Sequence, residues 1–210
     1  MSVPDVSPAR LPRGRHGIDA EVVAASQRQR LMRAVIQVVG ERGWSETRIA
    51  DVVAAAAVSR RTFYELFGGL EACFMAAVDA GFDLLTAALD EPDPAGEIDF
   101  EARVRRFLRY YLQLLEATPG ATRALHIEMV RATDEVRAQH DRVMDAIGER
   151  LLASRFGDGD RTGIPADVGV ALVAGFEHLL SRHIRGGGDV SALASVIDDA
   201  AAIAVRALAD

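Results

Sequence analysis

The sequence of 210 residues contains one cysteine, Cys73, and no lysine among its 24 basic residues. A single cysteine excludes an internal disulfide and is too few for a cysteine-ligated metal cluster, so a reducing cytoplasm is the expected location. No apolar run reaches the roughly 18 residues that a membrane-spanning helix needs. The opening stretch MSVPDVSPARLPRGRHG carries proline and arginine in place of an apolar segment, which argues against a signal peptide or a membrane anchor.

Residue sets with the spacing of a catalytic or metal site are also lacking. HIE at 126–128 has the His-x-Glu of zinc deaminases, but those enzymes also need a Cys-x-x-Cys pair, and the chain has one cysteine. RGGGD at 185–189 lacks the preceding strand and the Lys-Ser/Thr ending of a phosphate-binding loop. We therefore expect a protein that is not an enzyme and that uses no cofactor or metal.

Charge is distributed unevenly along the chain, whose net charge is -7. Residues 1–70 carry a net charge of +3, whereas residues 71–210 carry -10. Such an asymmetry is expected when one part of a chain contacts a polyanion and the other part needs only solubility.

Apolar residues recur at helical spacing almost throughout, which predicts an all-α fold of about nine helices. We expect a basic N-terminal arm at 1–25, a three-helix domain at 26–68 and a larger helical domain at 69–210. In the three-helix domain, Gly43 can end the first helix in a left-handed cap. Thr47 and Ser59 can cap two short helices. The inner faces of these short helices carry Ile49, Val52 and Val53, and Phe63, Leu66 and Phe67.

Two short helices joined by a tight turn and packed on a longer one form a helix-turn-helix. Its second short helix turns Arg61, Tyr64 and Glu65 outward, with Arg60 and Thr62 beside them. Arginine can bind guanine edges or clamp a phosphate, and the hydroxyls of threonine and tyrosine can bind phosphates. The pattern therefore favours a DNA major groove, while the alternative is a solvated helix face on which Arg61 and Glu65 pair.

The segment QRQRLMRAVIQVVGERGWSETRIADVVAAAAVSRRTFYELFGGLEACF resembles the DNA-binding segment of the TetR/AcrR family of bacterial transcriptional regulators. The positions in register are Gly43-Trp44, Thr47, Val58-Ser59 and Thr62-Phe63-Tyr64 through Phe67. The resemblance implies phosphate contacts from Thr47, Arg48, Thr62 and Tyr64, and base contacts mainly from Arg60 and Arg61, with Ser59 at the start of the same surface. Two positions depart from the family pattern: Ala57 stands for the usual glycine of the turn and Leu70 for a usual lysine.

The N-terminal arm is a second candidate for DNA contact. PRGRHG at 12–17 looks like the Arg-Gly-Arg core of an AT-hook, in which arginines lie along an A·T-rich minor groove. Arg13 and Arg15 would make these contacts. The alternative is a disordered tail with incidental arginines.

From residue 70 onward the pattern predicts longer helices, over 70–89, 98–117, 121–132, 134–156, 165–185 and 191–208. The helix at 165–185 is apolar nearly all round, and the helix at 191–208 is rich in alanine, so two such pairs can form a four-helix bundle across a two-fold axis. In the family the last two helices form the dimer in this way. The alternative is that both are core helices of a monomer.

The helices between residues 70 and 156 are expected to enclose a pocket for a small-molecule effector. The candidate contacts are Phe82, Phe107, Tyr110, Tyr111, His126, Met129 and His140. For each of them alone, a structural role in the core is the stronger interpretation. The helix after the helix-turn-helix, expected from Gly69, would carry a displacement of Phe82 to the recognition helix.

The residues and the resemblance together predict a homodimeric transcriptional regulator that binds a double-stranded DNA operator. We expect a repressor that a small molecule releases from DNA, without a membrane partner. The alternative is a helical small-molecule binding or sequestering protein with a vestigial helix-turn-helix, which Ala57 and Leu70 favour.

Overall fold

The computed structural model describes residues 20–87, 99–156, 164–165, 167–188 and 190–208. These residues form nine α-helices and three short helical turns and contain no strand, so the predicted all-α fold is confirmed. The α-helices are α1 (Ala20–Arg42), α2 (Ile49–Ala56), α3 (Arg60–Leu66), α4 (Leu70–Ala87), α5 (Phe100–Ala117), α6 (Pro119–Arg123), α7 (Asp134–Phe156), α8 (Val168–Arg185) and α9 (Ala194–Ala207). The short turns are η1 (Ala124–Glu128), η2 (Met129–Arg131) and η3 (Val190–Leu193). Within the described ranges, no helix is long and apolar enough to cross a membrane.

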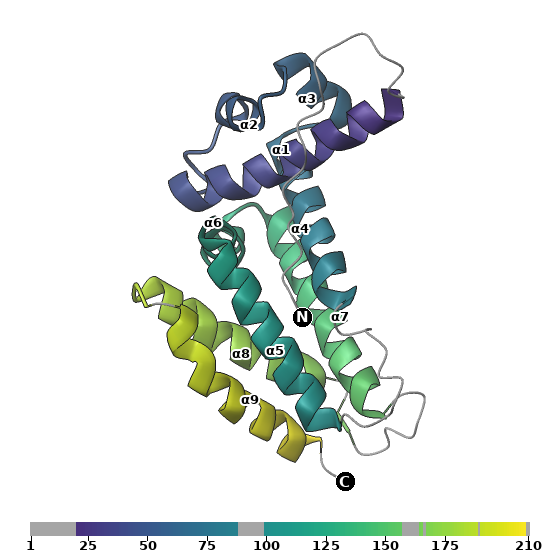
Figure 1. Cartoon of the computed structure of the whole chain (residues 1–210), viewed down its shortest axis with the longest axis vertical. Coiled ribbons are helices and arrows are strands. Elements are labelled where there is room, and N and C mark those ends of the chain that lie inside the picture. Colours follow the sequence, from purple (N-terminus) through teal and green to yellow (C-terminus); the bar gives the residue numbers. More distant parts are fainter. Residues whose placement is uncertain (1–19, 88–98, 157–163, 166, 189, 209–210) are drawn as a thin grey trace.

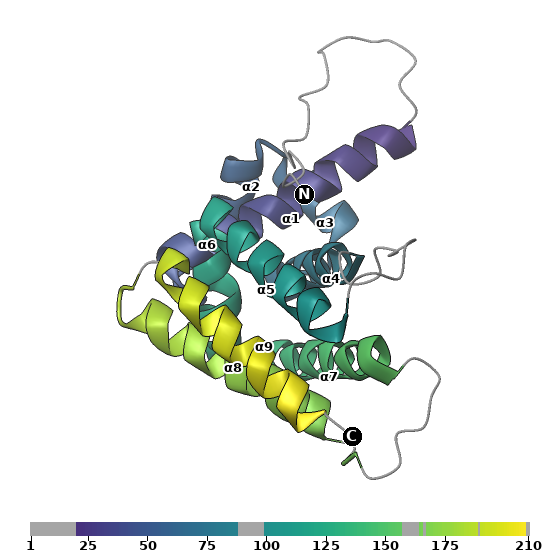
Figure 2. The same cartoon turned by 60° about the horizontal axis from the view of Figure 1, so that its bottom comes forward.

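The helices form two regions along the long axis of the molecule. Figure 1 shows α1, α2 and α3 together at one end, and α4 leading away from them. The pair α8 and α9 lies side by side beyond α5, as Figures 1 and 2 both show. The first helices and the last two helices therefore lie in different parts of the molecule, connected by α4 to α7.

The end of α1 follows the prediction for Gly43. This residue has φ +88°, and its N–H donates to the carbonyl of Val39 at 2.8 Å. Glycine adopts this left-handed conformation without the steric cost that a side chain would bring. The predicted left-handed cap is confirmed, and it sets the direction in which the chain enters the helix-turn-helix.

The prediction that Thr47 caps α2 is wrong. The N-cap of α2 is Arg48, whose backbone N–H is accepted by the carboxylate of Asp51 at 3.1 Å. The hydroxyl of Thr47 instead donates to the carbonyl of Gly43 at 2.8 Å. Thr47 therefore satisfies an acceptor just beyond α1, while Asp51, three residues beyond the cap, supplies the capping carboxylate.

Two apolar cores stabilise the two regions. The first joins the helix-turn-helix to α4, η1 and the start of α7, and its fully buried members include Val35, Phe63 and Phe74. The second joins α5, α8 and α9 through residues such as Leu108, Leu180 and Ile197. The helices of the helix-turn-helix thus share a core with η1, which lies far from them in the sequence.

The predicted helix at 121–132 is not one regular helix. Pro119 occupies the first turn of α6, where a missing N–H costs nothing. The chain then continues as a π-helical turn, η1, and a 3-10 turn, η2. π-Helical turns occur mostly as single turns and are frequent at functional sites.

The packing of α1 on α6 is unusually close. A Cβ atom on Gly40 would lie 2.0 Å from the carbonyl oxygen of Gly120, so no side chain fits between α1 and α6 at this point. The backbone of the DNA-binding end therefore lies directly against the segment that leads into η1.

Candidate functional site

The α3 helix presents the predicted DNA-binding side chains. Ser59 is its N-cap, and the Ser59 Oγ accepts the backbone N–H of Thr62 at 3.0 Å. Phe63 is fully buried beneath the helix, which turns the neighbouring positions outward. The side chain of Arg61 is 88% exposed, and Tyr64 is 50% exposed.

The outward side chains of α3 also contact one another. Arg61 Nε donates to Glu65 Oε1 at 2.8 Å, so the pairing that the solvated-face interpretation requires is present. Arg60 lies over the ring of Tyr64, 5.8 Å from its centroid. Both contacts lie on the exposed side of α3, and exposed contacts of this kind are weak, so they do not prevent either arginine from binding a phosphate or a base.

Thr47 and Arg48 lie at the start of α2, and they differ in accessibility. Arg48 is exposed, but Thr47 is only 3% exposed and its hydroxyl proton is used by Gly43. A phosphate contact from Thr47 stays a prediction. Arg13 and Arg15 lie outside the described residues, so their minor-groove contact stays a prediction as well.

Two arginines of α1 that the sequence prediction left out hold the helix-turn-helix turn. Ala57 has φ 49° and ψ 47°, the left-handed conformation that costs a residue with a side chain about 1 to 2 kcal/mol. Arg30 Nη2 donates to the carbonyl of Ala57 at 2.6 Å and to that of Ala56. Arg28 Nη1 donates to the carbonyl of Leu66 at 3.3 Å. Arg30 therefore ties the C-terminal end of α2 to α1, and Arg28 ties the C-terminal end of α3 to α1.

A cavity of about 790 Å³ lies among α5, α7, α8 and α9, with Leu85 contributed by α4. The sequence predicts a pocket enclosed by the helices between residues 70 and 156. This prediction is wrong, because α8 and α9 form much of the cavity wall. Apolar side chains make up most of the lining, including Phe107, Leu108, Ile147, Leu151 and Phe176. Such a lining suits a ligand with a large apolar part.

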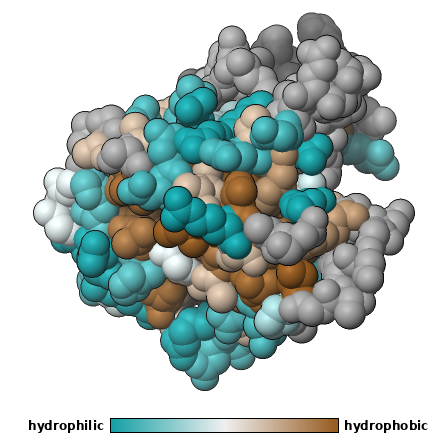
Figure 3. Space-filling model, turned by 90° about the horizontal axis from the view of Figure 1, so that it is seen from below, coloured by the Kyte–Doolittle hydropathy of each residue, from teal (hydrophilic) through white to brown (hydrophobic). Residues whose placement is uncertain are grey.

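The cavity also reaches the surface between α8 and α9. Its lining includes exposed residues of both helices, such as Gly175, His178 and Ile203, and Ile203 is 56% exposed. Seen from the end opposite the helix-turn-helix, the surface has apolar residues gathered in the middle of the face with polar residues around them (Figure 3).

The structure separates the predicted effector contacts into two groups. Phe107 and Tyr111 line the cavity, and their rings stack with centroids 6.3 Å apart. The other predicted contacts lie outside its lining: Phe82, Tyr110, His126, Met129 and His140. Met129 belongs to the core of the helix-turn-helix, and Tyr110 is buried in α5. Effector contacts from these five residues have no support in the described cavity.

His126 is nevertheless hydrogen-bonded to two residues of the cavity wall. Its Nε2 lies 2.7 Å from the hydroxyl of Tyr111, and its Nδ1 lies 2.9 Å from Glu177 Oε1. Ser181 Oγ donates to Glu177 Oε1 at 2.8 Å and is 3.1 Å from the carbonyl oxygen of His126. These four residues, which we call the His126 network, join α5, η1 and α8.

Burial and hydrogen bonding set the protonation of this network. Burial raises the pKa of Tyr111, so its hydroxyl stays protonated. Burial alone would raise the pKa of Glu177, but the hydrogen bonds from His126 and Ser181 and the charge of His126 outweigh it and lower the pKa. Glu177 is therefore ionised at neutral pH and accepts a hydrogen bond from His126 Nδ1.

Two residues after His126, Glu128 connects η1 to the helix-turn-helix. Its Oε2 accepts the backbone N–H of Trp44 at 3.1 Å, and its Oε1 is 3.2 Å from Arg123 Nη2. A Cβ atom on Gly43 would lie 3.2 Å from the same Oε2, so the carboxylate fits closely against the turn between α1 and α2. Side chains of η1 therefore contact both the cavity wall and the DNA-binding end.

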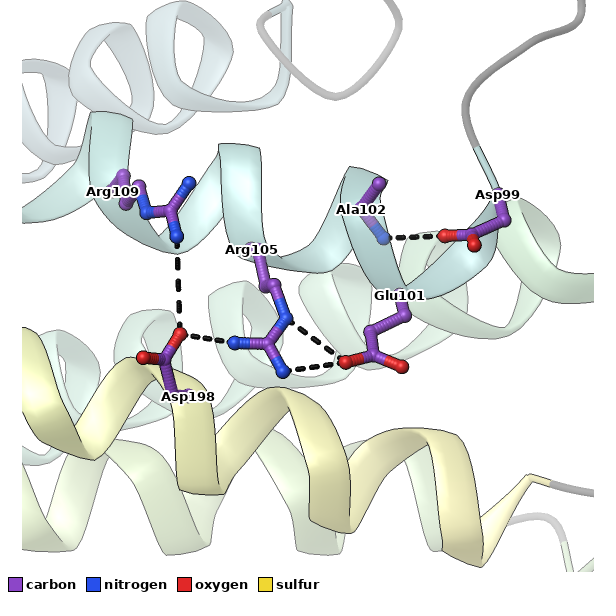
Figure 4. A network of polar contacts seen from close by, with 6 residues as sticks. All are labelled: Asp99, Glu101, Ala102, Arg105, Arg109 and Asp198. Carbon is purple, nitrogen blue, oxygen red and sulfur yellow. Dashed lines mark hydrogen bonds and ion pairs between the residues drawn. The ribbon is translucent and has the colours of Figure 1, made fainter.

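The outer side of α5 is tied to α9 by ion pairs (Figure 4). Arg105 contacts Glu101 on its own helix and Asp198 on α9, and Arg109 Nη2 lies 3.8 Å from the same Asp198 carboxylate. Asp99, the N-cap of α5, accepts the N–H of Ala102 at 2.7 Å. These contacts fix the helix that carries Phe107 and Tyr111.

Cys73 is fully buried on α4, and burial raises its pKa to about 12. It is therefore a neutral thiol at physiological pH, as expected of an unreactive core residue.

Comparison with known proteins gives a family for the DNA-binding end. Residues 31–77 match the family described as bacterial regulatory proteins, tetR family. This range covers α2, α3, most of α1 and the start of α4. A comparison with curated protein sequences found no match.

Solved structures match the fold over nearly the whole chain. A TetR-like transcriptional regulator from Rhodococcus sp. RHA1 is 23% identical, with a TM-score of 0.60, over 94% of this chain and 99% of that one. The fatty acid degradation regulator FadR from Bacillus halodurans is 14% identical, with a TM-score of 0.67, over 83% and 94%. The regulator FadR from Bacillus subtilis, in complex with stearoyl-CoA, is 14% identical, with a TM-score of 0.64, over 82% and 96%.

Proposed function

We propose that this chain is a DNA-binding transcriptional regulator of the TetR family, a homodimeric repressor that leaves its operator when a small molecule fills the cavity. The observation that carries the proposal is a continuous set of contacts from the cavity to the helix-turn-helix. Tyr111 and Glu177 line the cavity, His126 binds both, and Glu128 on the same turn binds Trp44.

On DNA, each protomer would place α3 in a major groove. Two copies related by a two-fold axis would reach successive grooves of a near-palindromic operator, about one helical turn or slightly more apart. Arg60 and Arg61 are exposed on α3, and they support base contacts there. Tyr64 and Thr62 support phosphate contacts, because each carries a hydroxyl near the outer side of the helix.

The effector would occupy the cavity with its apolar part. The volume of about 790 Å³ and the mostly apolar lining support a ligand of this kind. The structure of Bacillus subtilis FadR with stearoyl-CoA, which shares the fold, agrees with an effector that carries an acyl chain.

Induction needs a route from the cavity to α3, and the structure offers two. The first is α4, which follows α3 directly but contributes only Leu85 to the cavity lining. The second is η1, where a shift of the His126 network would move Glu128 against the α1–α2 turn. The second route is hydrogen-bonded to two residues of the cavity wall, Tyr111 and Glu177, so we propose that it carries most of the coupling. A ligand is required only to favour one of two states of these contacts.

Dimerisation would use α8 and α9. The exposed side of α8 carries small residues, including Ala171, Ala174 and Gly175, and α9 exposes Ile203. Small residues allow close approach of helices in a four-helix bundle. The partner would then also cover the part of the cavity that reaches the surface between these helices.

The sequestering protein with a vestigial helix-turn-helix is not favoured by the positions that suggested it. Ala57 forms the left-handed turn with Arg30 bound to its carbonyl, and Leu70 packs against the core below α3. The helix-turn-helix is thus held in place despite both departures from the family pattern.

The proposal is tested with the full-length protein and DNA from upstream of its own gene. Fluorescence anisotropy should show binding that weakens steeply with salt, and much weaker binding to random DNA of equal length. Equal affinity for both DNAs, or affinity that does not change with salt, contradicts a sequence-specific regulator. The alternative, a sequestering protein with a vestigial helix-turn-helix, predicts the affinity that does not change with salt.

A further inference from the structure

The four arginines of α5 fall into two pairs. Arg105 and Arg109 lie on the outer side and contact Asp198, as Figure 4 shows. Arg103 and Arg106 line the cavity instead. Within the described residues, neither Arg103 nor Arg106 forms an ion pair with a carboxylate. Among the described residues, the two α5 arginines near Asp198 therefore have a carboxylate partner, and the two arginines at the cavity have none.

Arg103 also has an unsatisfied donor. Its Nη2 donates to the carbonyl of Ser154 near the end of α7 at 3.1 Å. Its Nε is buried and is, in the part of the chain that the structure describes, the one buried side-chain nitrogen or oxygen without a hydrogen-bond partner. Burying a donor without an acceptor is unfavourable, and more so when the group is charged. Arg103 and Arg106 both line the cavity, where an anion would supply their counter-charge.

The acidic side chains of the cavity wall do not supply a counter-charge to Arg103 and Arg106. Glu177 is engaged by His126 and Ser181. Asp199 is exposed on α9 and makes no ion pair with Arg103 or Arg106. Of the acidic residues that line the cavity in the described part of the chain, neither Glu177 nor Asp199 pairs with the two arginines.

Apolar residues of the cavity wall lie between the two arginines and the His126 network. Tyr111 lies about 12 Å further along α5 than Arg103, at the helical rise per residue. The wall between them is formed by apolar side chains such as Phe107, Leu108, Ile147 and Leu151. The cavity therefore has a cationic end near the start of α5, an apolar middle, and the His126 network at the other end.

We propose that the ligand of this cavity is an amphiphile with an anionic head group, a carboxylate or a phosphate, and that Arg103 and Arg106 bind that head group. Its apolar chain would lie along Phe107 and reach Tyr111. The ligand is the effector only if the proposed function holds, but its recognition by the two arginines is independent of DNA.

Three probes of equal chain length test the proposal by calorimetry with the full-length protein: decanoate, decyl phosphate and decanol. We expect the two anions to bind at least about tenfold more tightly than the neutral alcohol. A preference for decanoate over decyl phosphate would assign the head group as a carboxylate, and the reverse would assign it as a phosphate. Equal binding of decanol and both anions, or no binding of any probe, overturns the proposal.

Arginine variants locate the contact. Arg103→Gln and Arg106→Gln should each weaken binding of the preferred anion by about tenfold and leave decanol binding unchanged. Arg109→Gln removes the same charge from the outer side of the same helix and should bind like the wild type. Wild-type affinity in both cavity variants overturns the assignment. If Arg103→Gln does not fold, Arg106→Gln and the comparison of probes decide the question.

Operator affinity in the same preparations separates this inference from the proposed function. Anion binding that depends on the arginines but does not release DNA contradicts the repressor mechanism and supports the head-group assignment. Release of DNA by decanol as well as by the anions supports the repressor mechanism and contradicts the assignment.

Discussion

Glu128 and Trp44 are 84 residues apart in the sequence, yet the Glu128 carboxylate accepts the backbone N–H of Trp44 at 3.1 Å. Trp44 begins the turn between α1 and α2, and Glu128 ends the π-helical turn that carries His126. Because His126 is hydrogen-bonded to two residues of the cavity wall, the Glu128–Trp44 hydrogen bond connects η1, and through it the cavity wall, to the helix-turn-helix.

Replacing Glu128 by alanine should weaken this connection. Glu128→Ala removes the acceptor of the Trp44 N–H, so the free energy of unfolding should fall by about 1 to 3 kcal/mol. We also expect the effect of a cavity ligand on operator affinity to shrink, because η1 no longer binds the α1–α2 turn. Urea unfolding and anisotropy with and without decanoate measure the two effects. Glu116→Ala, an exposed glutamate at the end of α5, is the matched control. Full ligand response in a folded Glu128→Ala protein would show that α4 carries the signal.

Base contact by Arg61 is the sharpest prediction for α3. Arg61→Ala should cost about 1 to 3 kcal/mol at the operator and much less at random DNA. Glu65→Ala removes only the partner of the Arg61 ion pair and should not weaken operator binding. Tyr64→Phe should weaken binding to both DNAs alike, as expected for a phosphate contact. An equal loss at both DNAs for Arg61→Ala would make Arg61 a phosphate contact.

The ionised Glu177 should make stability depend on acid pH. Its pKa in the folded protein lies below its usual value of 4.5, so the unfolded chain binds a proton more readily. The stabilisation is therefore complete above about pH 4.5 and is lost as the pH falls through the folded pKa. Urea unfolding should show a difference between wild type and Glu177→Gln that is constant near neutral pH and shrinks in acid. A difference that grows on acidification would mean that Glu177 is not stabilised as an anion.

A charge on the exposed side of α8 should break the proposed dimer. A Cβ atom on Gly175 would meet nothing within 4 Å, so Gly175→Glu is compatible with the folded protomer. Across a two-fold axis the new carboxylate would lie in a close helix contact near its own copy. Sedimentation should then show a monomer. Gly81→Glu on α4, where a Cβ atom also meets nothing within 4 Å, should stay a dimer. A dimeric Gly175→Glu protein would place the interface elsewhere.

Local patterns in the sequence were enough to predict the elements of the helix-turn-helix. A glycine at position 43, a serine before α3 and the spacing of Phe63 and Phe67 each act within a few residues, so the left-handed cap, the N-cap and the buried face could be predicted. The sequence predicts Thr47 as the N-cap of α2, because Thr47 and Asp51 both lie in the short segment where the helix begins and either side chain can cap it. The structure resolves this in favour of Arg48 and Asp51.

The cavity and its connections were harder to predict, because they depend on which helices meet. Periodicity shows that a face of α8 is buried, but it does not show that this face forms a cavity wall with α5. Arg30 reaches Ala57 across 27 residues, and His126 reaches Glu177 across 51. No sequence pattern around Arg30 or His126 indicates these distant partners. Only Phe107 and Tyr111 of the predicted effector contacts line the cavity, because they share the inner face of α5.

The coupling of the cavity to DNA binding is tested most directly by measuring operator affinity of the wild-type dimer with and without decanoate at one salt concentration. Calorimetry on the same sample establishes that the cavity is occupied. The repressor mechanism predicts that occupancy weakens operator binding by at least about tenfold, roughly 1.4 kcal/mol of coupling, while the dimer stays intact. Unchanged operator affinity with the cavity occupied would contradict it.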